Sequence, residues 1–404
     1  MNKKTIIVRE AYDWITEKDV SPEQFEDLIK YIEIKYPNDR ILEQRYKRLR
    51  FINYVGVIVC SGVRYEIIPK INLSKQDERQ ALLSMLSITN FLPISFYEKV
   101  RSGKEKSDLL SVFLATFLKN LLAELKKGIY KTYETNMDNL NILKGKLELT
   151  QHVQKNAFHK NKAYCSFDEY TENNILNQLF KSALMIVRQD TEIHTLKLQL
   201  ERCLGYLEGV DLITLNSNKL NQISFNRQNE RFRDAALFAK IIIEHASIYN
   251  QGNRSSSFSF LFPMNFLFEK YIEVALQEVV GTGKVISQHA EKRLLLNRKT
   301  GYKNILLKPD FIIDHTLIVD TKWKSATYND RTNYNQEDVY QMYAYVTAYQ
   351  EANRCILLYP KQENEADHPL WEIIDTDKTI EMHTIRIDDF RETVEELSRI
   401  MQRT

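Results

Sequence analysis

The sequence predicts a mixed fold in three successive parts: an α+β N-terminal region, a mainly helical middle region and an α/β C-terminal region. The first seventy residues contain runs of β-branched and aromatic residues broken by glycine. The next third carries long apolar stripes at helical spacing, and the last third combines apolar strand-like runs with amphipathic helices. A chain of 404 residues is also too long for one compact core, so several domains are expected.

The N-terminal region, residues 1–107, combines strands with flanking helices. Residues 5 to 9 read TIIVR, and residues 51 to 71 read FINYVGVIVCSGVRYEIIPKI, a strand pattern interrupted by Gly56 and by Ser61-Gly62. The surrounding segments, EQFEDLIKYIEI and residues 78 to 88, have helical spacing. The basic stretch RILEQRYKRLR, residues 40 to 50, fits either a nucleic-acid-binding patch or the solvated face of a helix.

The middle region, residues 108–250, is expected to be mostly helical. From Asp108 to about Met185 the spacing is helical, and the stretch DLLSVFLATFLKNLLAELKKG ends at Gly128, a good helix C-cap. Another helix is expected in NRQNERFRDAALFAKIIIEHASIY. The following stretch QGNRSSSFSF contains Gly, Asn and four Ser between two periodic segments, so we place the start of the last domain, residues 251–404, there.

Composition excludes several classes of protein. Lys and Arg (56) nearly balance Asp and Glu (54), so any contact with DNA must come from local basic patches. The four cysteines form no CxxC pair, which predicts reduced, buried thiols. No run of about 18 uncharged apolar residues and no signal-peptide pattern is present, so the expected location is the cytoplasm, without a membrane anchor.

Residues 308 to 324, KPDFIIDHTLIVDTKWK, carry the candidate chemistry. Asp320 and Lys322 point to the same face of an extended strand, while Thr321 points away, and a hairpin turning at Asp314-His315 would bring Asp310 to the same end. Asp310, Asp320 and the Thr321 carbonyl would supply hard oxygen ligands to Mg²⁺, and Lys322 would orient a water or stabilise developing charge. A buried Asp–Lys pair without a metal is the structural alternative.

Two helices add candidates to this site. In FPMNFLFEKYIEVALQEVV, Glu269 falls among apolar residues that include Phe262, Phe266 and Ile272, although a snorkelling glutamate would look the same. In EDVYQMYAYVTAYQ, Gln341 and Tyr345 lie one helical turn apart. They could brace Lys322 or contact DNA, or belong to a tyrosine-rich core helix without a function.

These motifs resemble the PD-(D/E)xK nuclease superfamily in its RecB-like branch with the QxxxY helix. More closely, FLFPMNFLFEKYI, LKPDFII, IVDTKWK and DVYQMYAY, with GVIVCSGVRYEIIPKI, LKGKLEL, FDEYTENNILNQLFK and NRQNERFRDAALFAKIII upstream, resemble the McrC subunits of McrBC modification-dependent restriction systems. The similarity runs from about residue 47 to residue 350. It implies a restriction-endonuclease-like C-terminal domain and a Mg²⁺-dependent DNA endonuclease in which Asp310, Asp320, Lys322, Glu269 and Gln341 are catalytic and Asp310, Asp320 and Thr321 hold the metal.

The resemblance also implies a partner. Such subunits act with a McrB-like AAA+ GTPase hexamer that binds the GTP and recognises methylated cytosine, and their N-terminal part docks on its ring. The sequence agrees in lacking a Walker A motif: in GTGK, residues 281 to 284, the required first glycine is replaced by Glu278 and the Lys is followed by Val. Two other interpretations stay open, a non-catalytic activator of the AAA+ partner and a free-standing RecB-like nuclease.

Overall fold

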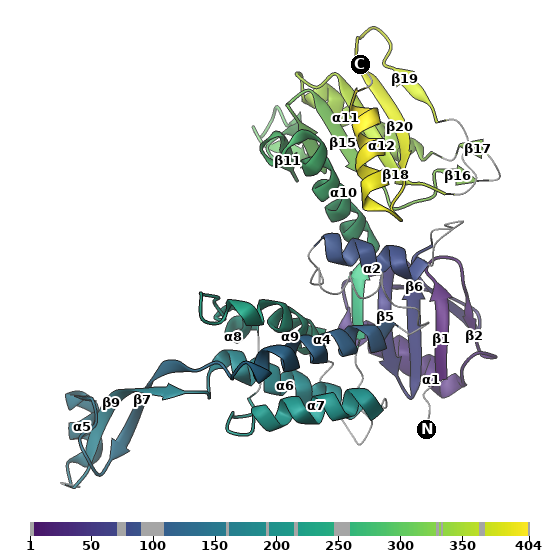
Figure 1. Ribbon diagram of the computed structural model, residues 1–404. Coiled ribbons are helices and arrows are strands. Elements are labelled where there is room, and N and C mark those ends of the chain that lie inside the picture. The colour runs from purple at the N-terminus through teal and green to yellow at the C-terminus, as the bar shows by residue number, and fades with distance from the viewer. Residues whose placement is uncertain are drawn as a thin grey trace. The chain divides into compact units, whose positions relative to one another are not determined.

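The computed structural model describes residues 4–70, 78–89, 109–158, 161–190, 194–213, 217–245, 259–328, 331–332, 334–362 and 368–402. It divides into two compact units (Figure 1). The first unit combines Lys3–Leu109 with Ser259–Thr404, and the second spans Leu110–Phe258. Most of the expected linker, residues 251–258, lies outside the described residues.

The N-terminal part of the first unit is built on a four-stranded sheet. The strand order is β1-β6-β5-β10, with β1 and β6 parallel and the other neighbours antiparallel. These strands are β1 (Lys4–Arg9), β5 (Tyr54–Cys60), β6 (Val63–Ile68) and β10 (Ser259–Pro263). The fourth strand therefore comes from the chain after the middle unit.

Gly56 makes the pairing of β5 with β10 possible. It lies opposite Leu261 with φ +132°, and a Cβ atom at this position would overlap the carbonyl oxygen of Phe260. Tyr31 and Ser259 add a side-chain hydrogen bond of 2.5 Å between their hydroxyl groups. Because β10 leads directly into α10 (Met264–Val280), this pairing fixes where that helix begins.

Two helices and a smaller sheet complete the N-terminal part. The helix α1 (Pro22–Lys35) starts with a capping box between Ser21 and Gln24, and α2 (Glu78–Ile88) packs on β6 and α10. The small sheet has the order β2-β4-β3, with β2 (Ile15–Thr16), β3 (Leu42–Arg45) and β4 (Arg48–Phe51).

The interpretation of the basic stretch at residues 40 to 50 as a helix face was wrong, because this stretch forms the β3–β4 hairpin, whereas its interpretation as a nucleic-acid-binding patch stays a prediction. Lys47 has φ 55° at the turn. Three arginines gather around the ring of Trp14, with Arg48 and Arg50 4.4 and 4.6 Å from its centroid. These guanidinium groups are therefore used in cation–π contacts within the hairpin region.

The C-terminal part of the first unit contains a mixed six-stranded sheet with the order β11-β14-β15-β18-β20-β19. β15, β18 and β20 are parallel, and the outer neighbours are antiparallel. The strands are β11 (Val285–Ser287), β14 (Phe311–Ile313), β15 (Leu317–Thr321), β18 (Arg354–Pro360), β19 (Leu370–Glu372) and β20 (Thr379–Ile385). Two short hairpins accompany it: β12 (Arg293–Leu296) with β13 (Lys303–Leu306), and β16 (Thr327–Tyr328) with β17 (Arg331–Thr332).

Helices cover both faces of this sheet. α11 (Gln336–Ala348) packs Met342 and Val346 against a core that contains Ile318 and Leu357. Because strand side chains alternate, Val319 and Thr321 face the opposite side, where α10 contacts β15 and α12 (Phe390–Gln402) contacts α10.

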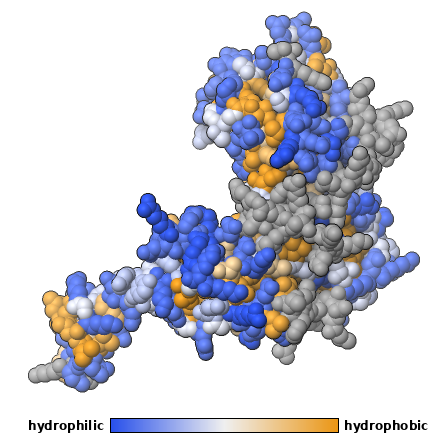
Figure 2. Space-filling model, viewed as in Figure 1, coloured by the Kyte–Doolittle hydropathy of each residue, from blue (hydrophilic) through white to orange (hydrophobic). Residues whose placement is uncertain are grey.

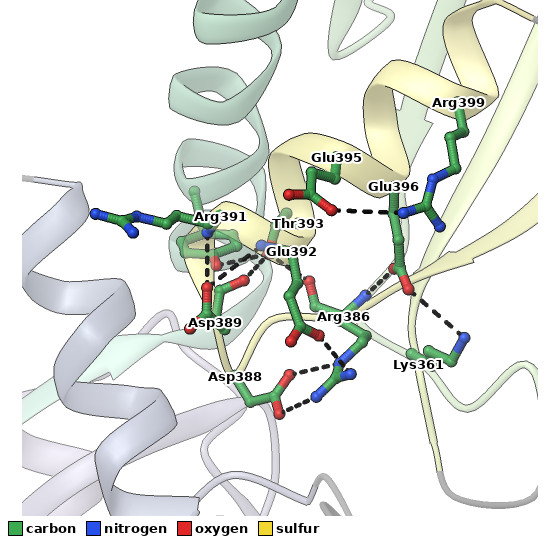
Figure 3. A network of polar contacts seen from close by, with 11 residues as sticks. Lys361, Arg386, Asp388, Asp389, Arg391, Glu392, Thr393, Glu395, Glu396 and Arg399 are labelled. Atoms are coloured by element: carbon green, nitrogen blue, oxygen red, sulfur yellow. Dashed lines mark hydrogen bonds and ion pairs between the residues drawn. The ribbon is translucent and has the colours of Figure 1, made fainter.

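The start of α12 is held by a polar network (Figure 3). Asp389 accepts hydrogen bonds from the Arg391 and Glu392 N–H groups, as an N-cap residue does. Arg386 pairs with Asp388 at 2.7 Å, and the Thr393 hydroxyl donates to the Arg386 carbonyl at 2.6 Å. This network fixes the helix that covers α10.

The middle unit has a helical core. Aromatic side chains from four helical segments pack together there: the ring centroids of Phe113 and Phe238 are 5.0 Å apart, and those of Phe180 and Phe232 are 5.7 Å apart. The helical segments are α4 (Leu109–Lys126), α6 (Ile175–Asp190), α7 (His194–Tyr206), α8 (Ser217–Asn221), η1 (Glu230–Phe232) and α9 (Arg233–His245). As predicted, α4 stops before Gly128, which has φ +120°.

The middle unit also contains strands where helix was expected. β7 (Thr132–Leu140) pairs along its whole length with β9 (Ala163–Thr171), while β8 (Lys146–Leu147) and α5 (Leu149–Asn156) complete an arm, residues 132–171. The helical prediction was wrong here because TYETNMDNL is rich in residues that disfavour helix.

Exposed apolar side chains gather on this arm, and Figure 2 shows an orange patch at its end. Large side chains that are more than half exposed there are Tyr133, Met137, Ile142, Leu143, Leu149, Val153, Phe158 and Tyr170. Monomeric soluble proteins rarely expose apolar patches of this kind, so the arm is a candidate contact surface.

All four cysteines are buried and free, as the sequence predicted. Within the described ranges, no helix is both long enough and apolar enough to cross a membrane.

Gly56→Ala tests whether the β5–β10 pairing holds the first unit together. We expect a loss of stability on the order of 2–4 kcal/mol, because the new methyl group would overlap the Phe260 carbonyl at a positive φ. Urea unfolding measures this loss. The control is Gly205→Ala in α7, where a Cβ meets no atom within 4 Å and helix propensity predicts a gain of about 1 kcal/mol or less. A Gly56→Ala protein as stable as this control would contradict the prediction.

Candidate active site

The sequence-predicted site residues meet in one pocket of about 400 Å³ in the first unit. Its walls come from β15, α10, α11 and the N-terminal part of the chain. They are formed by Asn53, Lys70, Asn265, Glu269, Lys308, Asp310, Asp320, Thr321, Lys322, Trp323, Lys324, Asp338 and Gln341. A larger hollow of about 800 Å³ shares Lys324 and Asp338 with it but contains none of the predicted catalytic residues.

Asp310 reaches the pocket through the β14–β15 hairpin. As predicted, the hairpin turns at Asp314 and His315, with φ 45° and 62°, and its register places Phe311 opposite Val319. The Asp310 carboxylate accepts hydrogen bonds from the Thr321 N–H at 2.8 Å and from the Thr321 hydroxyl at 2.7 Å. Thr321 thus connects the two strands at the end where the acidic residues meet.

Asp320 and Lys322 form a close pair at the end of β15. Asp320 is 2% exposed, and its Oδ2 atom forms an ion pair with Lys322 Nζ at 2.5 Å. Burial and then the neighbouring Asp310 raise the pKa of Asp320 to about 7, although Lys322 acts in the opposite direction. The buried carboxylate is therefore incompletely compensated by the protein alone.

The α11 helix holds Lys322 from the other side. Lys322 Nζ donates to Gln341 Oε1 at 2.9 Å, and Gln341 Nε2 donates to the Tyr345 hydroxyl at 2.7 Å. Tyr345 in turn donates to the Lys308 carbonyl at 3.0 Å. Of the roles considered for the QxxxY pattern, bracing Lys322 is the one that this chain of hydrogen bonds supports.

Glu269 lies on α10 and is half-buried. Its carboxylate accepts a hydrogen bond from Gln288, and burial followed by repulsion from Asp310 raises its pKa. The predicted apolar stripe was partly wrong, because Phe262 belongs to β10 and Phe266 is 42% exposed. Glu269 is nevertheless close enough to Asp310 for their charges to interact.

Sequence reasoning missed several residues of the pocket. Asp338 is 6% exposed and pairs with Lys324 at 3.1 Å, and its position three residues before Gln341 could have indicated it. Asn53 and Lys70 lie in the N-terminal part. No local sequence signal connects them to a strand some 250 positions away.

The residues present fit a divalent cation. In the part of the chain that the structure describes, no three His, Cys, Asp or Glu side chains form a metal-binding group. Mg²⁺ needs fewer protein ligands, because it binds through one or two carboxylates and keeps several waters. Asp310 and Asp320 would supply the carboxylates, and the Thr321 carbonyl lies on the same strand edge as its N–H, which faces Asp310. The buried Oδ2 atom of Asp320 has the Lys322 ammonium group as its ion-pair partner, and the second carboxylate, Asp310, lies close enough to raise the pKa of Asp320.

The fold and the pocket together define a mixed α/β protein with an Asp–Asp–Lys cluster at the end of a mixed sheet. A family model described as "McrBC 5-methylcytosine restriction system component" matches residues 49–360. This match covers most of the chain, so the chain belongs to that family, as the sequence resemblance predicted.

Solved structures show the same fold. A refined half-complex from a tetradecameric assembly of Thermococcus gammatolerans McrB AAA+ hexamers with bound McrC matches with a TM-score of 0.72 at 20% identity, covering 98% of this chain and 100% of that chain. The cryo-EM structure of the Thermococcus gammatolerans McrBC complex matches with a TM-score of 0.53 at 23% identity, covering 68% and 87%. No curated protein sequence matches this chain.

Asp320→Asn tests whether the pocket is built for a cation at the cost of stability. Since the fold disfavours the charged carboxylate, the variant should raise the Tm of the metal-free protein, more at pH 8 than at pH 5, and should lose stabilisation by Mg²⁺. Differential scanning calorimetry with and without Mg²⁺ measures both effects.

The matched control is Asp388→Asn. Asp388 is also buried, but its hydrogen bonds with Arg386 lower its pKa, so this substitution should lower the Tm. A Tm that falls equally in both variants would mean that Asp320 is an ordinary structural ion-pair partner.

Proposed function

We propose that this chain is the Mg²⁺-dependent endonuclease subunit of a restriction complex that acts on DNA containing modified cytosine. The observation that carries the proposal is the convergence of Asp310, Asp320 and Lys322 in one pocket, with Gln341 fixing the lysine. Two carboxylates and one ammonium group at a strand end suit phosphodiester hydrolysis. A buried Asp–Lys pair with only a structural role would not need the acidic neighbour Asp310, which raises the cost of the charged state.

In this proposal Asp310, Asp320 and the Thr321 carbonyl hold Mg²⁺. The bound ion would supply polarisation of the phosphate and a lowered pKa for a water molecule. The ammonium group of Lys322 orients the attacking water or stabilises the negative charge that develops on the phosphate. Gln341 keeps that ammonium group at the pocket because its own amide is oriented by Tyr345.

Glu269 has a supporting role in the proposed reaction. Its raised pKa and its hydrogen bond from Gln288 suit a group that positions water or orients a metal-bound group, rather than a direct ligand. Cleavage should therefore depend less on Glu269 than on Asp310 or Lys322.

The order of elements supports a PD-(D/E)xK domain as the C-terminal part. A helix with Glu269 precedes a hairpin with Asp310 and Asp320, Lys322 follows two positions later, and a helix with Gln341 and Tyr345 comes next. The parallel pairing of β15 with β18 across α11 gives the sheet its mixed character.

We further propose that a McrB-like AAA+ GTPase hexamer is the partner of this chain, that it binds the GTP, and that it reads the modified base. The support is the family match and the similarity to chains solved in complex with McrB hexamers. For the contact surface we propose the N-terminal region, residues 1–107, together with the arm. The arm is included because eight of its large apolar side chains are more than half exposed.

Plasmid cleavage tests the catalytic proposal. Methylated and unmethylated plasmids are incubated in Mg²⁺ with this protein, the AAA+ partner, or both, and with GTP, ATP or neither. We expect cutting only of methylated DNA with both proteins and GTP, and a loss of roughly a hundredfold or more for Lys322→Ala or Asp310→Ala. Partner binding and stimulation of its GTPase should be retained in both variants.

The same assay separates the alternatives. Cutting without the partner would favour a free-standing nuclease, and stimulated GTP hydrolysis without any cutting would favour a non-catalytic activator. Loss of both activities in Lys322→Ala would show that the residue is structural.

The contact surface is tested by a double variant of the arm, Ile142→Ser with Leu143→Ser, whose side chains are 70% and 67% exposed. We expect partner affinity to fall roughly tenfold or more, because the apolar contact is lost. Tyr46→Ser tests the N-terminal region, and Ile374→Ser, an equally exposed position in the C-terminal part, is the control. Titration calorimetry measures the affinities, and equal values for the arm variant and the control would exclude the arm.

A further inference from the structure

The residue after Lys322 is anchored on the N-terminal part of the chain. Trp323 is 3% exposed, and its indole N–H donates to the Glu10 carboxylate. Its carbonyl accepts a hydrogen bond from Lys70 Nζ at 3.0 Å. The ring also packs 5.5 Å from Phe268, the neighbour of Glu269 on α10.

Glu10 and Lys70 come from adjacent strand ends of the N-terminal sheet. Glu10 directly follows β1, its N–H donates to the Ile68 carbonyl at 3.0 Å, and Lys70 follows β6 by two positions. The same part of the chain also reaches α10, because the Asn53 carbonyl accepts the Met264 N–H at 2.8 Å. The N-terminal part thus contacts two of the elements that present the proposed catalytic residues, α10 and the segment after β15.

Burying the Glu10 carboxylate costs folding free energy. It is 0% exposed and its Oε2 atom has no hydrogen-bond partner. Burial raises the pKa of Glu10, and the nearby Lys70 opposes this only in part. Glu66 offers a contrast: it is equally buried, but Arg79 satisfies it with two hydrogen bonds inside the N-terminal part. The charge of Glu66 is thus compensated by an arginine of the N-terminal part itself, whereas Glu10 depends on Lys70 and on Trp323 of the C-terminal part.

The position of Trp323 determines the position of Lys322, because both residues follow the last residue of β15 and the sheet holds them only weakly. β15 ends at Thr321, and one more hydrogen bond, from the Lys322 N–H to the Leu358 carbonyl at 2.9 Å, extends the pairing. The chain then turns, with the Lys324 N–H donating to the Lys322 carbonyl. The Trp323 ring packs on Phe268 of α10, while Lys322 donates to Gln341 of α11, so holding Trp323 in place leaves Lys322 directed toward α11.

We propose that Glu10 is a positioning residue of the nuclease site: by holding Trp323 it sets the orientation of Lys322, so the N-terminal part completes the active geometry. This inference rests on the nuclease function proposed above. Glu10 touches neither the metal ligands nor the DNA in this proposal. Substituting Glu10 should therefore lower the rate of DNA cleavage and increase the mobility of the backbone around Trp323.

The test compares Glu10→Ala, Glu10→Gln and the matched control Glu66→Ala in the complete complex. Glu10→Ala should lower the cleavage rate at saturating DNA roughly ten- to hundredfold with little change in KM, because a small misplacement of a catalytic group is costly. Glu10→Gln, which keeps an acceptor for the indole, should restore most of the rate. Glu66→Ala should keep the wild-type rate per folded molecule.

Amide hydrogen exchange provides a readout that does not depend on activity. In Glu10→Ala, protection of residues 322–326 should fall roughly tenfold, while Glu66→Ala should leave this segment unchanged. Unchanged exchange in Glu10→Ala, or an equal loss in Glu66→Ala, would overturn the inference. If the wild-type complex does not cut DNA, the nuclease function fails, and the exchange measurement still decides whether Glu10 orders this segment.

Discussion

A buried carboxylate that the protein does not fully neutralise is the constraint around which the C-terminal part is organised. Asp320 sits almost without solvent contact beside a second carboxylate, Asp310, and the nearest cation is Lys322. Burying such a cluster costs free energy that hydrophobic packing must offset. The tight hairpin turn, the Thr321 contacts and the Gln341–Tyr345 pair all restrict the same few atoms, which is the preorganisation that catalysis by electrostatics requires.

The N-terminal and C-terminal parts of the first unit are joined by a common strand and by side-chain hydrogen bonds. One sheet takes its fourth strand from residues after the middle unit, and the helix that follows this strand carries Glu269. Contacts of Trp323 with Glu10 and Lys70 add a second attachment at the other side of the pocket. A change in the N-terminal sheet would therefore reach the pocket through two rigid elements, without a flexible linker between them.

Much of the pocket could be predicted from sequence because its residues lie in short periodic segments. The two-residue period places Asp320 and Lys322 together, a recognisable turn returns Asp310, and the helical period pairs Gln341 with Tyr345. Lys70, Asn53 and Glu10 could not be found this way, because their contacts join positions separated by about 200 residues or more. The strands of the arm and the β3–β4 hairpin were missed because polar, charged strands on a solvated surface lack the apolar alternation that marks a half-buried strand.

The shared strand β10 also sets an order for folding. The strand that contains Gly56 can pair with β10 only after Leu261 has been synthesised, and the whole middle unit is synthesised between these two residues. Pairings so distant in sequence form slowly, whereas the middle unit contains its own core and can fold as it leaves the ribosome. A chain that ends before β10 therefore lacks the finished sheet, although Glu10 and Lys70, which anchor Trp323, are already present. The pocket can therefore form only in a chain that extends at least to Gln341, long after its N-terminal walls have been synthesised.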